Sequence, residues 1–157
     1  MKKFDEILHT ALCRICGLLI FSMMAVTFSQ VLARYAMQAS LSWSEEAGRY
    51  IFVWIAFLGL PAAFRSGSHV ALDLLLKALR GTSRRTLEII NGAFVVLLGA
   101  TIFIAGIRLV QLGAFQQSPA LNLPMYAVFL VIPASGALLL YFSLRALWEA
   151  IMARNKE

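Results

Sequence analysis

The sequence predicts an all-α integral membrane protein with four transmembrane helices, and three observations carry that prediction. The chain of 157 residues is 61% hydrophobic and only 14% charged, whereas a soluble domain is about 45–50% apolar and about 25% charged. Its mean hydropathy is +0.79, and a small domain has too little interior to hide so much apolar surface. Four apolar stretches are each long enough to cross a bilayer, which takes roughly 20 residues.

The four stretches are expected to form a single membrane domain over residues 1–157. They cover approximately residues 15–36, 44–64, 87–112 and 124–148. The first stretch has an alternative interpretation as a signal peptide, because Lys2 and Lys3 precede it. Its apolar run exceeds the about 7–15 residues of a signal peptide and lacks a small-x-small cleavage site, so a retained helix is favoured.

The basic residues predict the orientation of the chain. Of 14 Lys and Arg residues, all but Arg34, Arg49 and Arg108 fall in segments that four alternating helices bring to one side of the membrane. Lys and Arg accumulate on the cytoplasmic side of membrane proteins. Both termini are therefore expected in the cytoplasm. This bias also accounts for the pI of about 9.8 without nucleic-acid binding.

A short patterned segment lies between the second and third stretches. Residues 69–80 are mostly apolar and include His69, Asp73 and Lys77. Asp73 and Lys77 are four residues apart and would share one face of a helix. We expect an amphipathic helix that lies in the cytoplasmic interface. The alternative is that the second transmembrane helix continues past a kink after Gly67.

Residues that could carry chemistry are scarce. The apolar stretches contain neutral polar residues such as Thr27 and Gln30, but no ionisable residue near mid-membrane, where such a residue is a functional-site hypothesis by default. Cys13 and Cys16 have a C-x-x-C spacing, but a zinc site needs more ligands. We interpret them as two small apolar residues at the start of a helix. No catalytic, cofactor-binding or metal site is expected, and the chain is not expected to be an enzyme.

Charged residues gather where the second helix begins. Ser42 and Glu45 have the S-x-x-E spacing of a capping box. Glu45 and Glu46 both fall in the first turn, where the helix dipole favours negative charge. Arg49 is spaced to pair with either carboxylate. Two interpretations stay open: a capped and neutralised helix start, or a docking site for a partner protein.

Aromatic residues surround the same corner. Tyr35 follows Arg34 at the end of the first helix, so both are expected near the start of the second. Trp43, Tyr50 and Trp54 recur at helical spacing and form one stripe. Tyr and Trp favour the membrane–water interface. The stripe indicates packing, either within this chain or against another subunit.

Glycines form a regular seam on the third helix. Gly92, Gly99 and Gly106 are seven residues apart. Small residues let membrane helices approach closely, so the seam predicts a packing surface without naming its partner. Pro61 and Pro133 lie inside the second and fourth helices, and each is expected to kink its helix because it removes a backbone donor.

An ordered set of motifs runs along the chain. Its segments are Arg34-Tyr35, Trp43-Ser44-Glu45-Glu46, Arg49-Tyr50-Ile51-Phe52-Val53-Trp54, Phe57-Leu58-Gly59, Ala63, Arg65, Gly67, His69-Val70, Asp73, Leu123-Pro124 and Ile132-Pro133-Ala134-Ser135-Gly136. This ordered set resembles a known family, the DctQ-like small membrane subunits of tripartite ATP-independent periplasmic (TRAP) transporters. The segments run from about residue 34 to residue 136, and the four-helix plan covers the whole chain.

The resemblance implies a role in transport. In this family a small subunit partners a large elevator-type membrane subunit, which holds the substrate and sodium sites. A periplasmic binding protein delivers an organic acid such as a dicarboxylate or sialic acid. The small subunit is thought to extend the static scaffold. The resemblance thus implies a bacterial inner-membrane protein with no cofactor, whose partners are the large subunit, the binding protein and membrane lipids.

Two other functions compete with this one. A stand-alone homo-oligomeric four-helix carrier would be expected to bury a carboxylate at mid-membrane, and none is present there in the sequence. A membrane enzyme or electron carrier would be expected to have paired histidines at membrane depth. His9 and His69 are instead predicted near the cytoplasmic edge.

Overall fold

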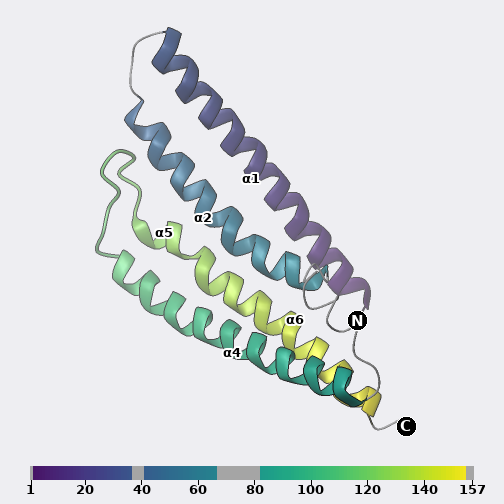
Figure 1. Ribbon diagram of the computed structural model, residues 1–157. Coiled ribbons are helices and arrows are strands. Elements are labelled where there is room, and N and C mark those ends of the chain that lie inside the picture. The colour runs from purple at the N-terminus through teal and green to yellow at the C-terminus, as the bar shows by residue number, and fades with distance from the viewer. Residues whose placement is uncertain (1, 37–40, 67–81, 155–157) are drawn as a thin grey trace. The chain divides into compact units, whose positions relative to one another are not determined.

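The computed structural model describes residues 2–36, 41–66 and 82–154. The helices in chain order are α1 (Lys2–Ala36), α2 (Ser42–Arg65), α4 (Thr82–Gly113), α5 (Met125–Phe129) and α6 (Val131–Arg154) (Figure 1). No strand occurs among the described residues beyond an isolated bridge between Gln117 and Pro124. The expected interfacial helix over residues 69–80, with His69, Asp73 and Lys77, lies outside the described residues.

Four helical segments are long and apolar enough to cross a membrane, which confirms the predicted fold class. They are Asp5–Ala36, Ser42–Arg65, Ile89–Gly113 and Met125–Glu149. The described chain divides into two compact units, one within residues 1–59 and 108–131 and the other within residues 60–107 and 132–157. Each unit is described separately below.

The first helix is longer than its predicted transmembrane part. α1 begins at Lys2 rather than near Ile15. Its 35 residues span about 52 Å at about 1.5 Å each, against a hydrocarbon core of about 30 Å. Neither Gly nor Pro occurs before Gly17, and Asp5 in the first turn suits the helix dipole. Hydropathy identifies the apolar part of a helix, whereas the helix itself continues through polar residues.

The predicted fourth span is interrupted near its start. α5 ends at Phe129, and α6 begins at Val131. Phe129, the last residue of α5, lies four residues before Pro133, which has no N–H to donate to the Phe129 carbonyl. Pro133 thereby falls in the first turn of α6, where backbone N–H groups have no helical partner in any case. Pro61, by contrast, lies inside α2 without ending it.

Within the second unit, α4 packs along α6 through the glycine seam. The contacts pair Gly92 with Leu147, Gly99 with Leu140 and Gly106 with Pro133. The α6 residues therefore also recur every seven positions, in the opposite direction along the chain (Figure 1). A reciprocal contact comes from Gly136 of α6, where an added Cβ would lie 2.6 Å from the backbone N of Phe103. The partner of the predicted seam is thus a helix of the same chain.

Candidate functional site

The start of α2 is held by Ser44. Its hydroxyl donates to the carbonyl oxygen of Leu41 at 2.7 Å, and its backbone N–H donates to the same oxygen at 3.1 Å. Ser42 is itself the first residue of the helix. No Ser42–Glu45 hydrogen bond of the expected capping box is found between these two described residues, and the Glu45 carboxylate accepts from Arg49 at 3.3 Å. Arg49 thus pairs with Glu45, the first of the two carboxylates that its spacing allows.

The Glu45–Arg49 pair and Glu46 differ sharply in burial. Both side chains of the pair are 68% exposed, so their attraction is screened by solvent and worth little. Glu46, one position along, is only 8% exposed. The helical turn therefore directs two adjacent and chemically identical residues into different surroundings, one facing outward and one inward.

The buried carboxylate of Glu46 contacts the loop that joins α4 to α5, residues 114–124, which we call the α4–α5 loop. Its Oε2 accepts hydrogen bonds from the backbone N–H groups of Ala120 and Leu121, each at 2.9 Å. Its Oε1 accepts a short hydrogen bond from the Tyr50 hydroxyl, one helical turn along α2. Three donors therefore converge on one carboxylate, and all belong to the first unit.

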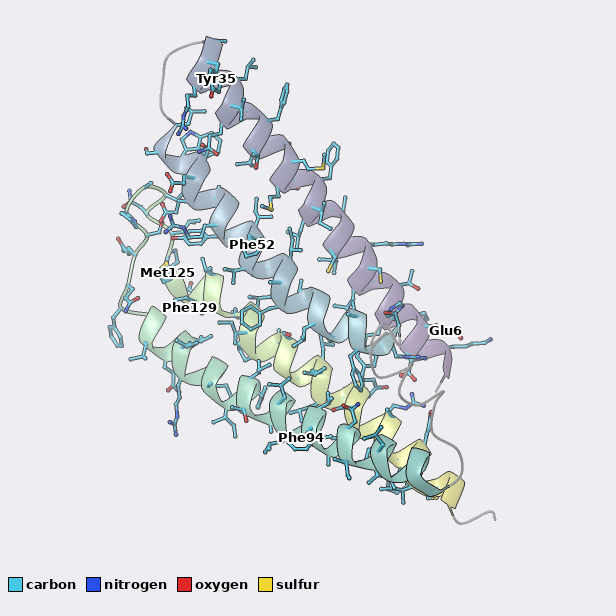
Figure 2. The ribbon with its side chains drawn as sticks, viewed as in Figure 1. Glu6, Tyr35, Phe52, Phe94, Met125 and Phe129 are labelled. Carbon is cyan, nitrogen blue, oxygen red and sulfur yellow. The ribbon has the colours of Figure 1, made fainter. Side chains whose placement is uncertain are left out.

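Tyr50 also links α2 to the start of α5. Its hydroxyl oxygen lies 3.4 Å from the Met125 sulfur, and Figure 2 labels Met125 where the α4–α5 loop enters α5. A thioether is a weak acceptor, and the single hydroxyl proton is already donated to Glu46. The Met125 contact is therefore chiefly one of packing.

The α4–α5 loop has its own internal hydrogen bonds. The N–H of Ser118 donates to the Leu123 carbonyl at 2.9 Å, and the N–H of Asn122 donates to the Ser118 carbonyl at 3.1 Å. The Ser118 hydroxyl, on a residue only 1% exposed, accepts from the N–H of Leu123 at 3.3 Å. Asn122 adopts a φ of 50°, a left-handed conformation that asparagine tolerates better than most residues. The loop is thus a closed turn fastened to α2 at Ala120 and Leu121.

The other residues predicted for this corner stay at its surface. Arg34 is exposed at the end of α1 and makes no ion pair with Glu45 or Glu46 within the described part of the chain. Tyr35 is 80% exposed (Figure 2). Trp43 is 43% exposed and Trp54 is half-buried. The structure therefore joins Glu46 to the α4–α5 loop and Tyr50 to Glu46 and Met125, and leaves Arg34 and Tyr35 at the surface.

The sequence patterns did not predict that Glu46 accepts hydrogen bonds from a loop more than seventy residues further along the chain. One pattern could have suggested it. Arg49 could pair with either acid, but Glu45 alone suffices for the capping box and for the ion pair, so Glu46 remained available for another contact. Glu46 and Tyr50 are four residues apart and share a helical face, which indicates a polar contact on the inner side of α2.

The cysteines lie on one face of α1. The Cys13 sulfur is 3.7 Å from Nε2 of His9, and Cys16 is half-buried nearby. Across the described ranges, no three His, Cys, Asp or Glu side chains come together in a group that could hold a metal ion.

The fold and this corner define a polytopic helical membrane protein whose polar side chains hold helices and a loop together. Residues 23–153 match the family model of the tripartite ATP-independent periplasmic transporters, DctQ component. This match covers most of the sequence, and the chain belongs to that family. It is a membrane subunit of a transporter and not an enzyme.

Several relatives carry names that agree with the family. The chain is 26% identical over 138 residues to a putative TRAP transporter small permease protein of Haemophilus influenzae, covering 88% of this chain and 86% of that protein. It is 32% identical over 104 residues to the C4-dicarboxylate TRAP transporter small permease protein DctQ of Rhodobacter capsulatus, covering 65% and 46% respectively.

A third relative is much longer. The chain is 35% identical over 103 residues to the isethionate TRAP transporter permease protein DctMQ of Oleidesulfovibrio alaskensis. The match covers 64% of this chain but only 16% of that protein. The chain therefore corresponds to a small part of one relative and to most of another.

Proposed function

We propose that this chain is the small membrane subunit of a TRAP transporter and that it serves as a static scaffold for a large transport subunit. Membership of the DctQ family is the observation that carries the proposal. The described structure supports it in a second way. The polar contacts of Glu46 with the α4–α5 loop, and those of the turn within that loop, are internal to the first unit and fix the loop against α2.

The proposed partners are a large elevator-type membrane subunit, a periplasmic binding protein and membrane lipids. A relative named as a single DctMQ permease is several times longer than the matched region, which supports a larger membrane partner. The proposed cargo is an organic acid taken up with sodium. The names of two relatives point to isethionate and C4-dicarboxylates, and both are organic anions.

The proposal also covers the orientation of the chain and the role of its exposed aromatic residues. Both termini are proposed to lie in the cytoplasm, and the distribution of basic residues supports this orientation. The exposed aromatic residues near the α2 start, Tyr35 and Trp43, are proposed as membrane-interface anchors or contacts with the large subunit.

The test is affinity purification of the tagged chain from its native membrane in mild detergent, with the co-purifying proteins identified by mass. A large polytopic protein in fixed stoichiometry, together with loss of organic-acid uptake when the chain is deleted, is the expected result. A homo-oligomer that stays free of any partner in several mild detergents would refute the subunit role and favour the stand-alone carrier.

A further inference from the structure

We infer that the Glu46 carboxylate holds the α4–α5 loop against α2 through its hydrogen bonds. The outward-facing Glu45–Arg49 pair beside it does not contribute to this attachment. The inference concerns a positioning residue within the chain and goes beyond the proposed scaffold role. It can be tested on the chain alone, so its failure would leave the transport proposal standing.

The Glu46 side chain is buried. A carboxylate that is removed from water is costly unless hydrogen bonds replace its hydration. Glu46 is 8% exposed, and its oxygens accept from Ala120, Leu121 and Tyr50. Hydrogen bonds to an ionised acceptor are roughly twice as strong as neutral ones. Among the described residues, these hydrogen bonds satisfy the carboxylate without a basic side chain.

The α4–α5 loop contributes two backbone donors to Glu46. The N–H groups of Ala120 and Leu121 point at Glu46 and take no part in the loop's own turn, which closes through Ser118, Asn122 and Leu123. Without Glu46 these two donors would need water or another acceptor, and backbone donors are rarely left unpaired near a membrane. The turn could persist, but its attachment to α2 would be lost at the centre of the loop.

Glu45 serves as a control for Glu46, because the two residues are neighbours on the same helix. Glu45 and Glu46 are adjacent and chemically identical, yet Glu45 forms an ion pair with Arg49 of its own helix, whereas Glu46 accepts from the loop. A change in charge or helix propensity affects both positions alike. A difference in loop exchange between matched variants at the two positions therefore reports the contact that Glu46 makes with the loop, over and above effects common to both positions.

The experiment is hydrogen–deuterium exchange with mass spectrometry on the full chain in lipid nanodiscs. It compares Glu46→Ala, Glu46→Gln and the control Glu45→Gln. We expect Glu46→Ala to speed exchange of the Ala120 and Leu121 amides by about tenfold or more, because two charge-assisted hydrogen bonds are lost. Peptides from α6 should exchange at the wild-type rate. Loop exchange as slow as in the wild type would overturn the inference.

The conservative variant keeps the test decisive if Glu46→Ala fails to fold. The Gln amide oxygen can still accept from Ala120 and Leu121, but it carries no charge. Glu46→Gln should therefore speed loop exchange by a few-fold, less than Glu46→Ala where both fold. Glu45→Gln should leave the loop within about twofold of the wild type. Equal loop exchange in Glu46→Gln and Glu45→Gln would show that the carboxylate does not hold the loop.

Discussion

Replacing a seam glycine with alanine tests the packing of α4 on α6 directly. At Gly106 an added Cβ would lie 2.6 Å from the backbone N of Pro133 and 2.7 Å from its Cδ. Ordinary contact begins at 3.4 Å, so the clash falls about 0.8 Å inside it. Both obstacles belong to the rigid ring and backbone of proline, so no side chain can rotate away. We expect Gly106→Ala to push the two helices apart locally.

The magnitude follows from a matched control. At Gly59, also inside a helix, an added Cβ meets nothing within 4 Å. Both variants gain the same helix propensity, up to about 1 kcal/mol for Gly to Ala. That gain cancels in the comparison. The difference in free energy of unfolding between Gly106→Ala and Gly59→Ala is then the cost of overpacking, about 1–3 kcal/mol.

The other two seam glycines predict a graded series. At Gly99 the nearest atoms are Leu140 Cγ at 3.1 Å and its backbone N at 3.2 Å, whereas at Gly92 only the Leu147 side chain lies close, with Cδ1 at 3.1 Å. The flexible end of Leu147 can move aside, but a backbone atom cannot. The expected order of destabilisation is therefore Gly106, then Gly99, then Gly92.

The assay is thermal unfolding of the purified chain in one detergent, followed by circular dichroism. A chain of this size shifts its Tm by about 2–4 °C per kcal/mol, so Gly106→Ala should melt roughly 2–12 °C below Gly59→Ala. Equal melting temperatures for these two variants would refute the packing described here. A reversed order between Gly92 and Gly106 would refute the explanation by rigid and flexible obstacles.

Three further predictions concern the corner of α2 and use the same melting assay. Arg49→Ala should lower the free energy of unfolding by less than about 1 kcal/mol because its pair with Glu45 is exposed; a larger loss would mean that Arg49 has a partner elsewhere. Tyr50→Phe should cost about 1–2 kcal/mol because Glu46 loses one donor, and no change would contradict this bond. Met125→Leu, which conserves volume, should cost less than about 1.5 kcal/mol, and a loss as large as that of Tyr50→Phe would show that the sulfur matters as an acceptor.

The helices were predictable because their signal is local and collective. Each transmembrane segment needs a run of apolar residues, and no soluble alternative accommodates so many of them. The start of α1 was not predictable from hydropathy, since residues 2–14 are helical without being apolar throughout. The break before α6 follows from Pro133, although hydropathy alone treats residues 124–148 as one segment.

The glycine seam was predictable as a surface but not as a contact. The seven-residue repeat of Gly92, Gly99 and Gly106 indicates close packing on one face. Its partners on α6 are Pro133, Leu140 and Leu147, which follow the same repeat. Leucines are common on every face of a membrane helix, however, so that repeat was not distinctive in the sequence. Three-dimensional structure was needed to choose α6 over another helix or another chain.

The corner of α2 shows why local rules gave only half of the site. Spacing within one helix correctly allowed the Glu45–Arg49 pair. The same spacing rules could not choose between Glu45 and Glu46 for the buried position, because burial depends on which side of α2 the rest of the unit covers. The loop residues that bind Glu46 contribute backbone N–H groups, and every residue except proline has one. The sequence therefore contains no signal that would identify Ala120 and Leu121 as the donors to Glu46.

The internal bonding of the polar residues constrains which surfaces are left for other molecules. In the first unit, Glu46, Tyr50 and Ser118 all contact groups of the same chain. The surface of α1, by contrast, is largely apolar, with Phe21 72% and Phe28 68% exposed. Between Arg14 and Arg34, α1 carries no charged side chain, so this part of its surface suits contact with lipid tails or apolar membrane helices rather than binding of a soluble anion. On the proposed function, this chain contributes position and packing, while recognition of the organic acid belongs to its partners.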